Sequence, residues 1–423
     1  MSSLFNSVLI GCVGKPNAGK SSFLNACTDA KAKVGSYSFT TIEPNQGVAY
    51  VTTDCPCAKY GKEAECSPRF GSCLAGVRRI PVKVLDVAGL IPGASEGLGL
   101  GNKFLDDLRH ASVLMHVIDV SGTTDEKGEA TEGYDPTNDV EWLRQEIHSW
   151  IFNNLWKKWT NIVRRHVATK TPVAETLQLQ LSGYGTRISL VHKVLAKMKL
   201  EEPVKMEEWD EETVRRLVDV FLELRFPTVL VLNKIDMEHS DTNLAKLCDR
   251  YPNAPIVPCS AMAEFFLRRL TKQGYVRYKA GDEYFATVDD DDDRQPGDKE
   301  LKRPDDKMAA RLDRLRDLVM YRYGGTGVQD ALNRAVAEMR MVPMYWVRNL
   351  SSMQCDRGEG AFKDGALIPP ETTVGELFKA INNDPTVILA YAEGPNGRVA
   401  EDSLVNPANN VLRFVTKAEA MAE

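Results

Sequence analysis

The sequence predicts an α/β fold built on a doubly wound, mostly parallel sheet, and three observations support it. Short apolar runs alternate with helical segments along most of the chain. A glycine-rich turn follows the first apolar run, and a polar motif follows a later one, as expected where loops leave the carboxyl ends of parallel strands. The 423 residues exceed what one hydrophobic core usually serves, so we expect two or three domains.

The first element is a buried strand over residues 7–13, which runs into the sequence GKPNAGKS at residues 14–21. This stretch fits the phosphate-loop pattern G-x-x-x-x-G-K-[ST], and a helix over residues 21–27 follows it. In such a loop, backbone N–H groups surround the phosphates of a nucleotide, Lys20 reaches the β- and γ-phosphates, and the Ser21 hydroxyl can ligate Mg²⁺. The predicted fold is therefore that of a P-loop NTPase, and a chance glycine-rich turn is the alternative.

A polar, turn-rich segment over residues 32–47 contains two adjacent threonines, Thr40 and Thr41. In phosphate-loop switch proteins, a threonine in this loop covers the γ-phosphate side of Mg²⁺ and leaves once that phosphate is lost. The pair lies about 20 residues after Ser21, a placement that favours the switch role.

A strand over residues 81–85 ends at Asp86 and leads into a segment rich in glycine over residues 89–101. Asp86 can hold Mg²⁺ through water, and the backbone N–H of Gly89 can approach the γ-phosphate. The glycines predict a mobile second switch segment. Leu90 stands where many small GTPases carry the glutamine that orients the attacking water, so another group, a cation or a partner must supply catalysis.

Four cysteines lie in an insertion before the strand at residues 81–85, with the spacing C-x-C-x8-C-x6-C. They are Cys55, Cys57, Cys66 and Cys73. Structural zinc sites usually show two C-x2-4-C pairs, and this segment has one irregular pair. The spacing therefore favours a hairpin insertion with reduced thiols, and a zinc site is the alternative.

An apolar run over residues 227–232 ends in the N-K-x-D motif of residues 233–236. An aspartate carboxylate accepts both N–H groups on one edge of guanine, whereas adenine offers no such pair of donors, so Asp236 specifies the base. After the next short strand, expected over residues 255–259, come Ser260 and Ala261, which can support the O6 edge of guanine.

The predicted site has two sets of residues. The nucleotide-binding residues are Asn17, Ala18, Gly19, Lys20, Ser21, Ser22, Asn233, Lys234, Asp236, Ser260 and Ala261, with one threonine of the pair Thr40 and Thr41. The Mg²⁺ ligands are Ser21, Asp86 and one of the same two threonines. No side chain is assigned as certainly catalytic, since Leu90 replaces the usual glutamine and Gly89 contributes only its backbone.

About 110 residues separate the strand at residues 112–119 from the one at residues 227–232, far more than a crossover needs. From Val140 onward, apolar residues recur at steps of mostly three and four, which predicts an inserted helical hairpin or coiled arm. Its first helix is expected to carry Trp142, Trp150, Trp156 and Trp159 beside several basic residues. These aromatic and basic side chains could bind RNA by stacking and phosphate pairing. We favour the alternative, in which the tryptophans pack the helices and the basic residues form a solvated face.

The last third of the chain begins with an acidic run at residues 289–293 and a polar stretch that continues to residue 307, which together predict a disordered loop. Residues 343–416 then read as strands around a turn and one short helix, the two together over residues 365–381, which predicts a small ubiquitin-like roll. The predicted domains are a nucleotide-binding domain (1–139 and 226–342), an inserted helical domain (140–225) and the C-terminal roll (343–423).

Composition narrows the function classes. No run approaches 18 apolar residues, so we expect no membrane span. The beginning of the chain lacks a basic leader and nine cysteines occur without secretory signs, so we expect a cytoplasmic protein with reduced thiols. A net charge of −6 argues against a globally basic nucleic-acid binder, so DNA is not an expected partner. A monomer is expected.

With these residues in place, the chain resembles the Obg-HflX-YchF superfamily of translation-factor-related GTPases, in its YchF-like branch. The motifs that carry the resemblance are GKPNAGKS, FTTIEPNQG, DVAGLIPGASEGLGLGNKFLDDLR and NKID, together with the helical insertion and a C-terminal segment similar to a TGS domain. The resemblance implies GTP/GDP and Mg²⁺ as cofactors and Thr41 as the switch ligand of Mg²⁺. Leu90 matches the hydrophobic replacement of the catalytic glutamine that is typical of this superfamily.

Two positions refine this expectation. Asn17 matches an asparagine that coordinates K⁺ in related cation-dependent GTPases, which implies acceleration by K⁺. The best-known YchF-like proteins carry an altered base motif and accept ATP, whereas residues 233–236 here form the intact guanine motif.

We therefore expect a slowly hydrolysing, Mg²⁺-dependent GTPase that acts as a switch on ribosomes or RNA. The alternatives are an ATP-hydrolysing regulator, and an RNA- or protein-binding scaffold in which nucleotide only stabilises the core.

Overall fold

The computed structural model describes residues 8–28, 45–87, 89, 93, 107–200, 204–293, 300–355, 359–382, 384 and 386–421. The predicted site residues Thr41 and Leu90 lie outside this set. The chain divides into two compact units. Unit 1 comprises Met1–Leu9, Cys27–Val84 and Leu332–Glu423, and unit 2 comprises Ile10–Ala26 and Leu85–Ala331.

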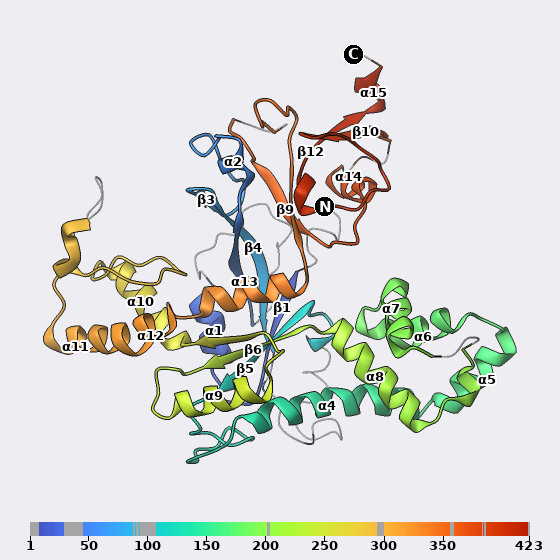
Figure 1. Cartoon of the computed structure of the whole chain (residues 1–423), viewed down its shortest axis with the longest axis horizontal. Helices are drawn as coiled ribbons and strands as arrows, with labels where there is room; N and C mark the ends of the chain where they lie inside the picture. Colours follow the sequence, from blue (N-terminus) through green and yellow to red (C-terminus); the bar gives the residue numbers. More distant parts are fainter. Residues whose placement is uncertain are drawn as a thin grey trace. The chain divides into compact units, whose positions relative to one another are not determined.

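The core of unit 2 is a parallel sheet, which confirms the predicted fold class (Figure 1). Its strands run in the order β1 (Leu9–Val13), β5 (Val113–Asp119), β6 (Thr228–Asn233) and β7 (Ile256–Cys259). Each neighbouring pair is parallel, and every residue of β5 is buried. Continuous apolar strands of this kind are typical of a sheet covered on both faces.

The chain reverses its direction of winding at β1. The end of β4 (Val77–Asp86) lies next to β1 on the side away from β5, where the N–H of Val87 donates to the carbonyl of Cys12 over 3.1 Å. Ligands of doubly wound sheets bind at such a switch point, beyond the carboxyl ends of the strands. The loops that follow β1 and β4 therefore meet where a ligand is expected.

The helices of unit 2 follow its strands. Their bounds are α1 Lys20–Cys27, α9 Ser240–Arg250, α10 Ala261–Gln273, α11 Asp306–Leu315, a π-helical turn Arg316–Met320, α12 Tyr321–Tyr323 and α13 Val328–Glu338, which continues into unit 1. Side chains of β5, β6, α10 and α11 share one buried apolar cluster. This cluster holds the strands that carry the site.

The insertion between β5 and β6 is helical, as the apolar periodicity predicts. It consists of α4 Thr137–Trp156, α5 Trp159–Thr169, α6 Val173–Leu181, α7 Ile188–Met198 and α8 Glu211–Arg225 (Figure 1). The prediction of one first helix that includes Trp159 was wrong, because α4 ends at Trp156 and a separate helix, α5, begins at Trp159. At the other end, Arg225 donates to the carbonyls of Arg109, Ala111 and Tyr184, which ties α8 to the sheet.

Unit 1 contains the cysteine insertion. Its elements are β2 Gln46–Asp54, the short helix α2 Pro56–Lys59, β3 Ser72–Leu74 and β4. Strands β3 and β4 are antiparallel, with Cys73 opposite Arg78, so the predicted hairpin is present.

The rest of unit 1 is a mixed five-stranded sheet in the order β11-β10-β12-β8-β9. The bounds are β8 Val342–Trp346, β9 Asp364–Ile368, α14 Val374–Ile381, β10 Leu389–Gly394, β11 Gly397–Val399, β12 Val411–Thr416 and the last turn α15 Lys417–Ala420. Residues of β8, β9, β12 and α14 form its buried core. Strands with one packed helix agree with the predicted roll, but the expected turn at residues 365–368 was wrong, since these residues pair with β8 as β9.

The acidic run also differs from its prediction, since Val288–Asp293 forms a short 3₁₀ segment rather than a disordered loop. Asp290 accepts from the N–H and hydroxyl of Thr287 and pairs with Arg316 at 3.1 Å. These contacts favour local order despite the low hydrophobicity. Among the described residues, no helix combines the length and apolarity needed to cross a membrane.

Candidate nucleotide site

One cavity of about 370 Å³ in unit 2 is lined by both sequence motifs. The lining residues are Asn17, Gly19, Lys20, Ser21, Ser22, Asn233, Lys234, Asp236, Met237, Ala261 and Met262. The phosphate loop and the N-K-x-D motif are more than 200 residues apart in the sequence. Their convergence on one cavity gives a site with a cationic end and a carboxylate end.

The two motif glycines at the ends of the phosphate loop are required by both conformation and space. Gly14 has φ +143°, and a Cβ there would lie 2.4 Å from the carbonyl oxygen of Val117. Gly19 has φ +100°, and a Cβ there would lie 2.2 Å from Nδ2 of Asn233. Since any side chain would strain the backbone and collide with a neighbour, the loop shape depends on glycine at both positions.

Lys20 supplies the positive charge of the cavity. It is the first residue of α1, and its Nζ donates to the carbonyl of Lys15 over 2.8 Å. Burial lowers the pKa of Lys20, and the nearby Asp86 carboxylate opposes this shift. The ammonium group therefore lies close to the loop backbone, where a phosphate would replace the carbonyl as its partner.

Ser21 and Asp86 lie together at the expected metal position. The Ser21 hydroxyl donates to Oδ2 of Asp86, which joins the start of α1 to the end of β4. A hydroxyl and a carboxylate are oxygen ligands of the kind that Mg²⁺ prefers, so this donor set fits the cation. Gly89 is adjacent, since a Cβ on it would lie 3.3 Å from Nζ of Lys20.

Asn233 connects the two halves of the cavity. Its Nδ2 donates to the carbonyl of Ala18 over 2.9 Å, and its Oδ1 accepts from the N–H of Ala261 over 3.1 Å. The side chain is buried at the end of β6. One amide thus holds the phosphate loop and the loop after β7 at a fixed separation.

The other motif residues are held by neighbours at the same sheet edge. Lys234 donates to Asp119 over 2.7 Å, and the Ser260 hydroxyl donates to Oδ1 of Asp236 over 2.6 Å. Burial acts to raise the pKa of Asp119, but hydrogen bonds from Lys234, Ser121 and Thr124 outweigh it and hold that pKa below its usual range. Asp119 was not assigned to the site from the sequence, although its position at a strand end was an available signal.

A buried ion pair beneath the phosphate loop was missed by sequence reasoning. Lys15 pairs with Asp139 at 3.0 Å, and both side chains are 1% exposed. Lys15 also donates to the carbonyl of Thr124 over 2.7 Å, and its Nζ lies 4.0 Å from the ring centre of Tyr134. Burial raises the pKa of Asp139, while Lys15 opposes that shift. The pair fixes the phosphate loop to the first turn of α4.

Helix α4 also reaches the second switch segment. Oε1 of Glu146 accepts from the N–H of Gly93 over 2.6 Å. Asp139 and Glu146 are seven residues apart, so they lie on one face of the helix. The same face of α4 therefore contacts the phosphate loop and a described residue of the glycine-rich segment.

His116 lies under the phosphate loop on β5 and is 2% exposed. Burial, followed by the charges of Lys20 and Lys15, lowers its pKa to about 3. Its Nε2 has no hydrogen-bond partner among the described residues. The imidazole is consequently neutral at physiological pH.

Asn17 has φ +62° and donates through Nδ2 to the carbonyl of Gly128 over 2.9 Å. A Cβ on Gly128 would lie 2.7 Å from the carbonyl oxygen of Pro16, so this segment packs closely on the loop. The hydrogen bond and the close packing together hold the side-chain amide of Asn17 in one orientation beside the phosphate loop.

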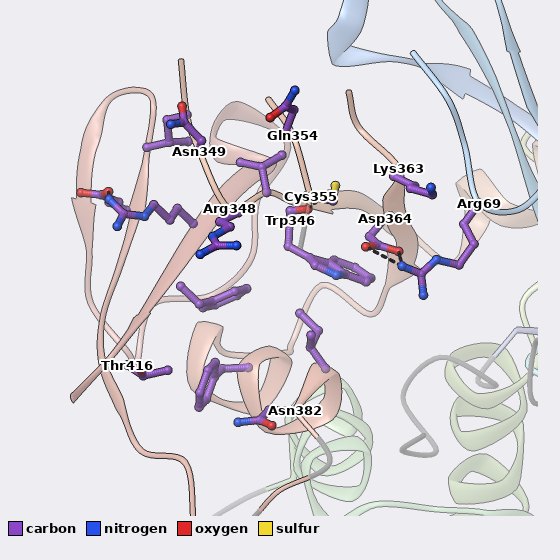
Figure 2. A pocket seen from close by; sticks show the side chains of 18 of the residues that line it. Arg69, Trp346, Arg348, Asn349, Gln354, Cys355, Lys363, Asp364, Asn382 and Thr416 are labelled. Carbon is purple, nitrogen blue, oxygen red and sulfur yellow. Dashed lines mark hydrogen bonds and ion pairs between the residues drawn. The ribbon is translucent and has the colours of Figure 1, made fainter. Parts of the chain in front are cut away.

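A second, larger cavity of about 1210 Å³ lies within unit 1 (Figure 2). Its charged lining comprises Arg69, Arg78, Arg348, Lys363 and Arg413 with Asp364, Glu393 and Glu419. Figure 2 shows Arg69 paired with Asp364, over 2.9 Å, beside Trp346. The cavity combines an excess of basic groups with an aromatic ring.

The tryptophans of the helical insertion pack inward. Trp159 stacks on Trp209 with ring centres 5.8 Å apart, and Trp150 meets Tyr184 edge to face at 5.2 Å. The neighbouring basic side chains of Lys157 and Arg164 are exposed. This arrangement agrees with the packing interpretation.

Comparisons with known proteins agree with the geometry. A family model described as "50S ribosome-binding GTPase" matches residues 9–154, and one described as "Obg-like GTPase YGR210-like, G4 motif-containing domain" matches residues 231–349. An uncharacterized GTP-binding protein of Schizosaccharomyces pombe is 45% identical over 98% of this chain and 99% of its own length. One from Methanocaldococcus jannaschii is 36% identical over 97% of this chain and 100% of its own length.

Two solved structures are similar to this chain over almost its whole length. The GTP binding protein from Pyrococcus horikoshii is 28% identical, with a TM-score of 0.71 over 97% of this chain and 100% of that one. The YchF GTPase of Schizosaccharomyces pombe is 17% identical, with a TM-score of 0.50 over 97% of this chain and 98% of that one, which supports the shared fold.

Proposed function

Because this chain belongs to the Obg-like GTPases, a family of GTP-binding proteins, we propose that it is a Mg²⁺-dependent, slowly hydrolysing GTPase that switches a ribosome- or RNA-bound activity. The observation that carries the proposal is the single cavity lined by the phosphate loop and by the N-K-x-D motif. It offers a cation and loop N–H groups for the phosphates and a carboxylate for the base.

The base is guanine in this proposal. Asp236 accepts one hydrogen bond from Ser260, which orients its carboxylate, and the cavity lies beside it. A site built to bond polar edges rejects bases that lack the matching donors, by roughly 10⁴-fold where buried groups stay unpaired. ATP would leave this carboxylate without its two N–H partners.

Residues Asn17–Ser22 would surround the phosphates, with Lys20 moving from the carbonyl of Lys15 to the β- and γ-phosphates. Ser21 and Asp86 would hold Mg²⁺, directly or through water, and Thr41 is the proposed third ligand. When bound, the cation supplies charge neutralisation between the β- and γ-phosphate oxygens.

Slow hydrolysis follows from the residue after Gly89. Leu90 lacks an amide to orient the attacking water, and the remaining chemistry rests on backbone groups and on Lys20. Asn17 lies at the loop mouth, so a K⁺ ion held there is our proposed additional charge. Equal turnover in Na⁺ and K⁺ buffers would contradict the K⁺ proposal alone.

Helix α4 is the proposed transmitter of the switch. Its Asp139 contacts the phosphate loop and its Glu146 contacts Gly93, so changes at the γ-phosphate can reach the helical insertion through one rigid element. A ligand shifts a two-state equilibrium only if it binds the two states with different affinity. The proposal therefore requires that GTP and GDP stabilise different arrangements of these two contacts.

The partner is proposed to be ribosomal RNA. The basic cavity of unit 1 supplies arginines for phosphates and Trp346 for stacking (Figure 2). The description of the family model over residues 9–154 points in the same direction. The C-terminal roll that carries this cavity is our proposed TGS-like domain, with boundaries at residues 343–423.

Asp236→Asn tests the nucleotide assignment most sharply. Xanthine carries a carbonyl where guanine carries an amino group, and an asparagine amide can accept from one edge atom and donate to the other. We expect calorimetry to show at least about a 100-fold loss of GTP affinity with a gain for xanthosine triphosphate, while Asp249→Asn on α9 changes neither. The gain also shows that the variant is folded.

Tighter binding of ATP than GTP by the unmodified chain would overturn guanine specificity and favour an ATP-hydrolysing regulator. The switch is tested by sedimentation with ribosomes in GDP and in a non-hydrolysable GTP analogue. Equal ribosome affinity in both states would contradict the switch and favour a scaffold in which nucleotide stabilises the core.

A further inference from the structure

Four cysteine side chains of unit 1 converge on one point, although their spacing favoured separate reduced thiols. They come from the residue before α2, from α2 itself, from the following loop and from β3, as Cys55, Cys57, Cys66 and Cys73. All four Sγ atoms lie within 4.8 Å of one another. The distance is 3.8 Å between Cys55 and Cys66 and 3.6 Å between Cys57 and Cys73.

These distances fit a metal centre. Four Zn–S bonds of about 2.3 Å in a tetrahedron place the sulfur atoms about 3.8 Å apart. The two contacts have the length of such tetrahedron edges. A disulfide needs an S–S bond of about 2.05 Å, and all four cysteines are free.

The surroundings of the sulfur atoms fit a bound dication. Four thiolates at this spacing repel one another, so full deprotonation requires a cation among them. Arg78 is 2% exposed and directs Nη1 toward Sγ of Cys66 at 3.8 Å, while the same nitrogen donates to the carbonyl of Phe362 over 2.9 Å. A buried donor held in this way is typical of the groups that support thiolate ligands.

The ligand set selects the type of metal. All four donors are sulfur, and Cys55 and Cys57 belong to a buried apolar cluster that includes Tyr345 and Phe362. Ca²⁺ and Mg²⁺ require oxygen ligands, whereas tetrahedral sites of four sulfurs hold zinc or iron. Four protein ligands leave no open position for a substrate, so the site is structural.

The cluster also joins separate parts of the chain within unit 1. Ser67, next to Cys66, donates its N–H to the carbonyl of Ala361 over 3.1 Å, and the N–H of Ala361 donates to Glu65 over 2.8 Å. A metal on the four cysteines would therefore fix the insertion against the residues that precede β9.

We propose that Cys55, Cys57, Cys66 and Cys73 bind one Zn²⁺ ion in a tetrahedral, structural site that stabilises unit 1. The site requires no nucleotide and is separate from the proposed GTPase chemistry.

Metal analysis of the full chain tests the proposal directly. The protein is purified under reducing conditions without chelators, and we expect about one zinc ion per chain. Replacing the metal with Co²⁺ should give the intense visible absorption of a tetrahedral thiolate complex. Both measurements use the unmodified sequence, so they do not depend on whether a variant folds.

Cys66→Ser, at the half-exposed ligand, is the variant, and Cys355→Ser is its control. Cys355 belongs to the same apolar cluster, but its thiol donates to the carbonyl of Trp346 over 3.2 Å. We expect zinc content to fall at least about fivefold in Cys66→Ser and to stay near one per chain in Cys355→Ser. Guanine nucleotide affinity reports whether unit 2 of each variant is folded.

Three results would overturn the proposal. The first is a wild-type chain with less than about a tenth of a zinc ion and four reactive thiols at this cluster. The second is unchanged zinc content in Cys66→Ser. The third is one iron per chain in place of zinc, which would contradict the assigned metal.

Discussion

The nucleotide cavity of unit 2 and the cysteine cluster of unit 1 are assembled in opposite ways. The cavity draws its residues from positions 17 to 262, yet two motifs predicted most of its lining. The cysteines lie within positions 55 to 73, yet their spacing pointed away from their convergence. In a parallel sheet the carboxyl ends of the strands lie at one edge, so residues that follow different strands can be expected to meet there. The path of an irregular loop has no such regularity.

The two sites also differ in what holds them. The cavity residues are fixed by polar contacts between loops, such as the one from Asn233 to Ala18. The cysteines lie in an apolar cluster with Tyr345 and Phe362. A substitution at one site should therefore leave the other site unaffected. For each variant below, the zinc content is measured together with the unfolding free energy or the nucleotide affinity.

The largest effect is expected from Lys15→Met. This change leaves the buried Asp139 without its cation, which should destabilise unit 2 by about 3–5 kcal/mol in denaturant unfolding. The double variant Lys15→Met, Asp139→Leu removes both charges and should recover most of that loss. A single-variant effect below about 1 kcal/mol would show that the ion pair does not hold the loop to α4. Loss of zinc in this variant would show that the two sites are not independent of each other.

A comparable effect is expected from acid. The folded pKa of His116 is about 3 against an ordinary value of 6.5. The unfolded chain takes up the proton first, so the stability from the neutral ring is present above pH 6.5 and is lost as pH falls toward 3. By pH 4 the loss should reach about 3 kcal/mol.

The measurement compares wild type with His116→Phe, which keeps a planar ring and cannot be protonated. Unfolding free energies of the two proteins between pH 7 and pH 4 should diverge as the pH falls, with wild type losing more. Parallel curves would exclude a buried neutral histidine beneath the loop.

Gly19→Ala should have a smaller effect, confined to ligand binding. The new Cβ would meet Nδ2 of Asn233 at φ +100°, and strain of about 1–3 kcal/mol corresponds to roughly a 5- to 150-fold loss of GTP affinity. Gly183→Ala is the matched control, because nothing lies within 4 Å of a Cβ at that position. An unchanged Kd in Gly19→Ala would mean that the contact between the two motifs contributes nothing to binding.

The smallest effect is expected from Glu146→Gln, which keeps an acceptor for Gly93 but removes its charge. A change of about 1 kcal/mol in this bond should alter the ratio of GTP to GDP affinity by about fivefold. Glu141→Gln removes a charge from the same helix at its contact with Arg250 and should leave the ratio unchanged. Similar ratios of GTP to GDP affinity in wild type, Glu146→Gln and Glu141→Gln would show that α4 takes no part in the proposed switch.

Prediction from sequence was good where a local pattern sets the geometry. The strands β1, β5, β6 and β7 were predicted to within two residues at each end, because each is a continuous apolar run that ends in a polar motif. The break between α4 and α5 carried no glycine or proline and was missed. Strand β9 was missed because its short run sits among turn residues and forms only by pairing with β8.

Within the site, the motif residues were predictable and their supports were not. Asp119 ends strand β5 directly opposite Asn233 at the end of β6, so its position was informative. Asp139 lies in the first turn of a helix, where an acid is ordinary, and its ion pair with Lys15 depends on tertiary packing. Glu146 likewise carries no local signal for its contact with Gly93.

The side-chain amide of Asn233 affects the free energy of nucleotide binding through the order of two loops. Because its two ends hold Ala18 and Ala261, this one side chain couples the order of the phosphate loop to that of the loop after β7. A nucleotide then loses little affinity to the immobilisation of protein loops. The coupling therefore favours ligands that contact both loops at once over ligands that contact one loop alone.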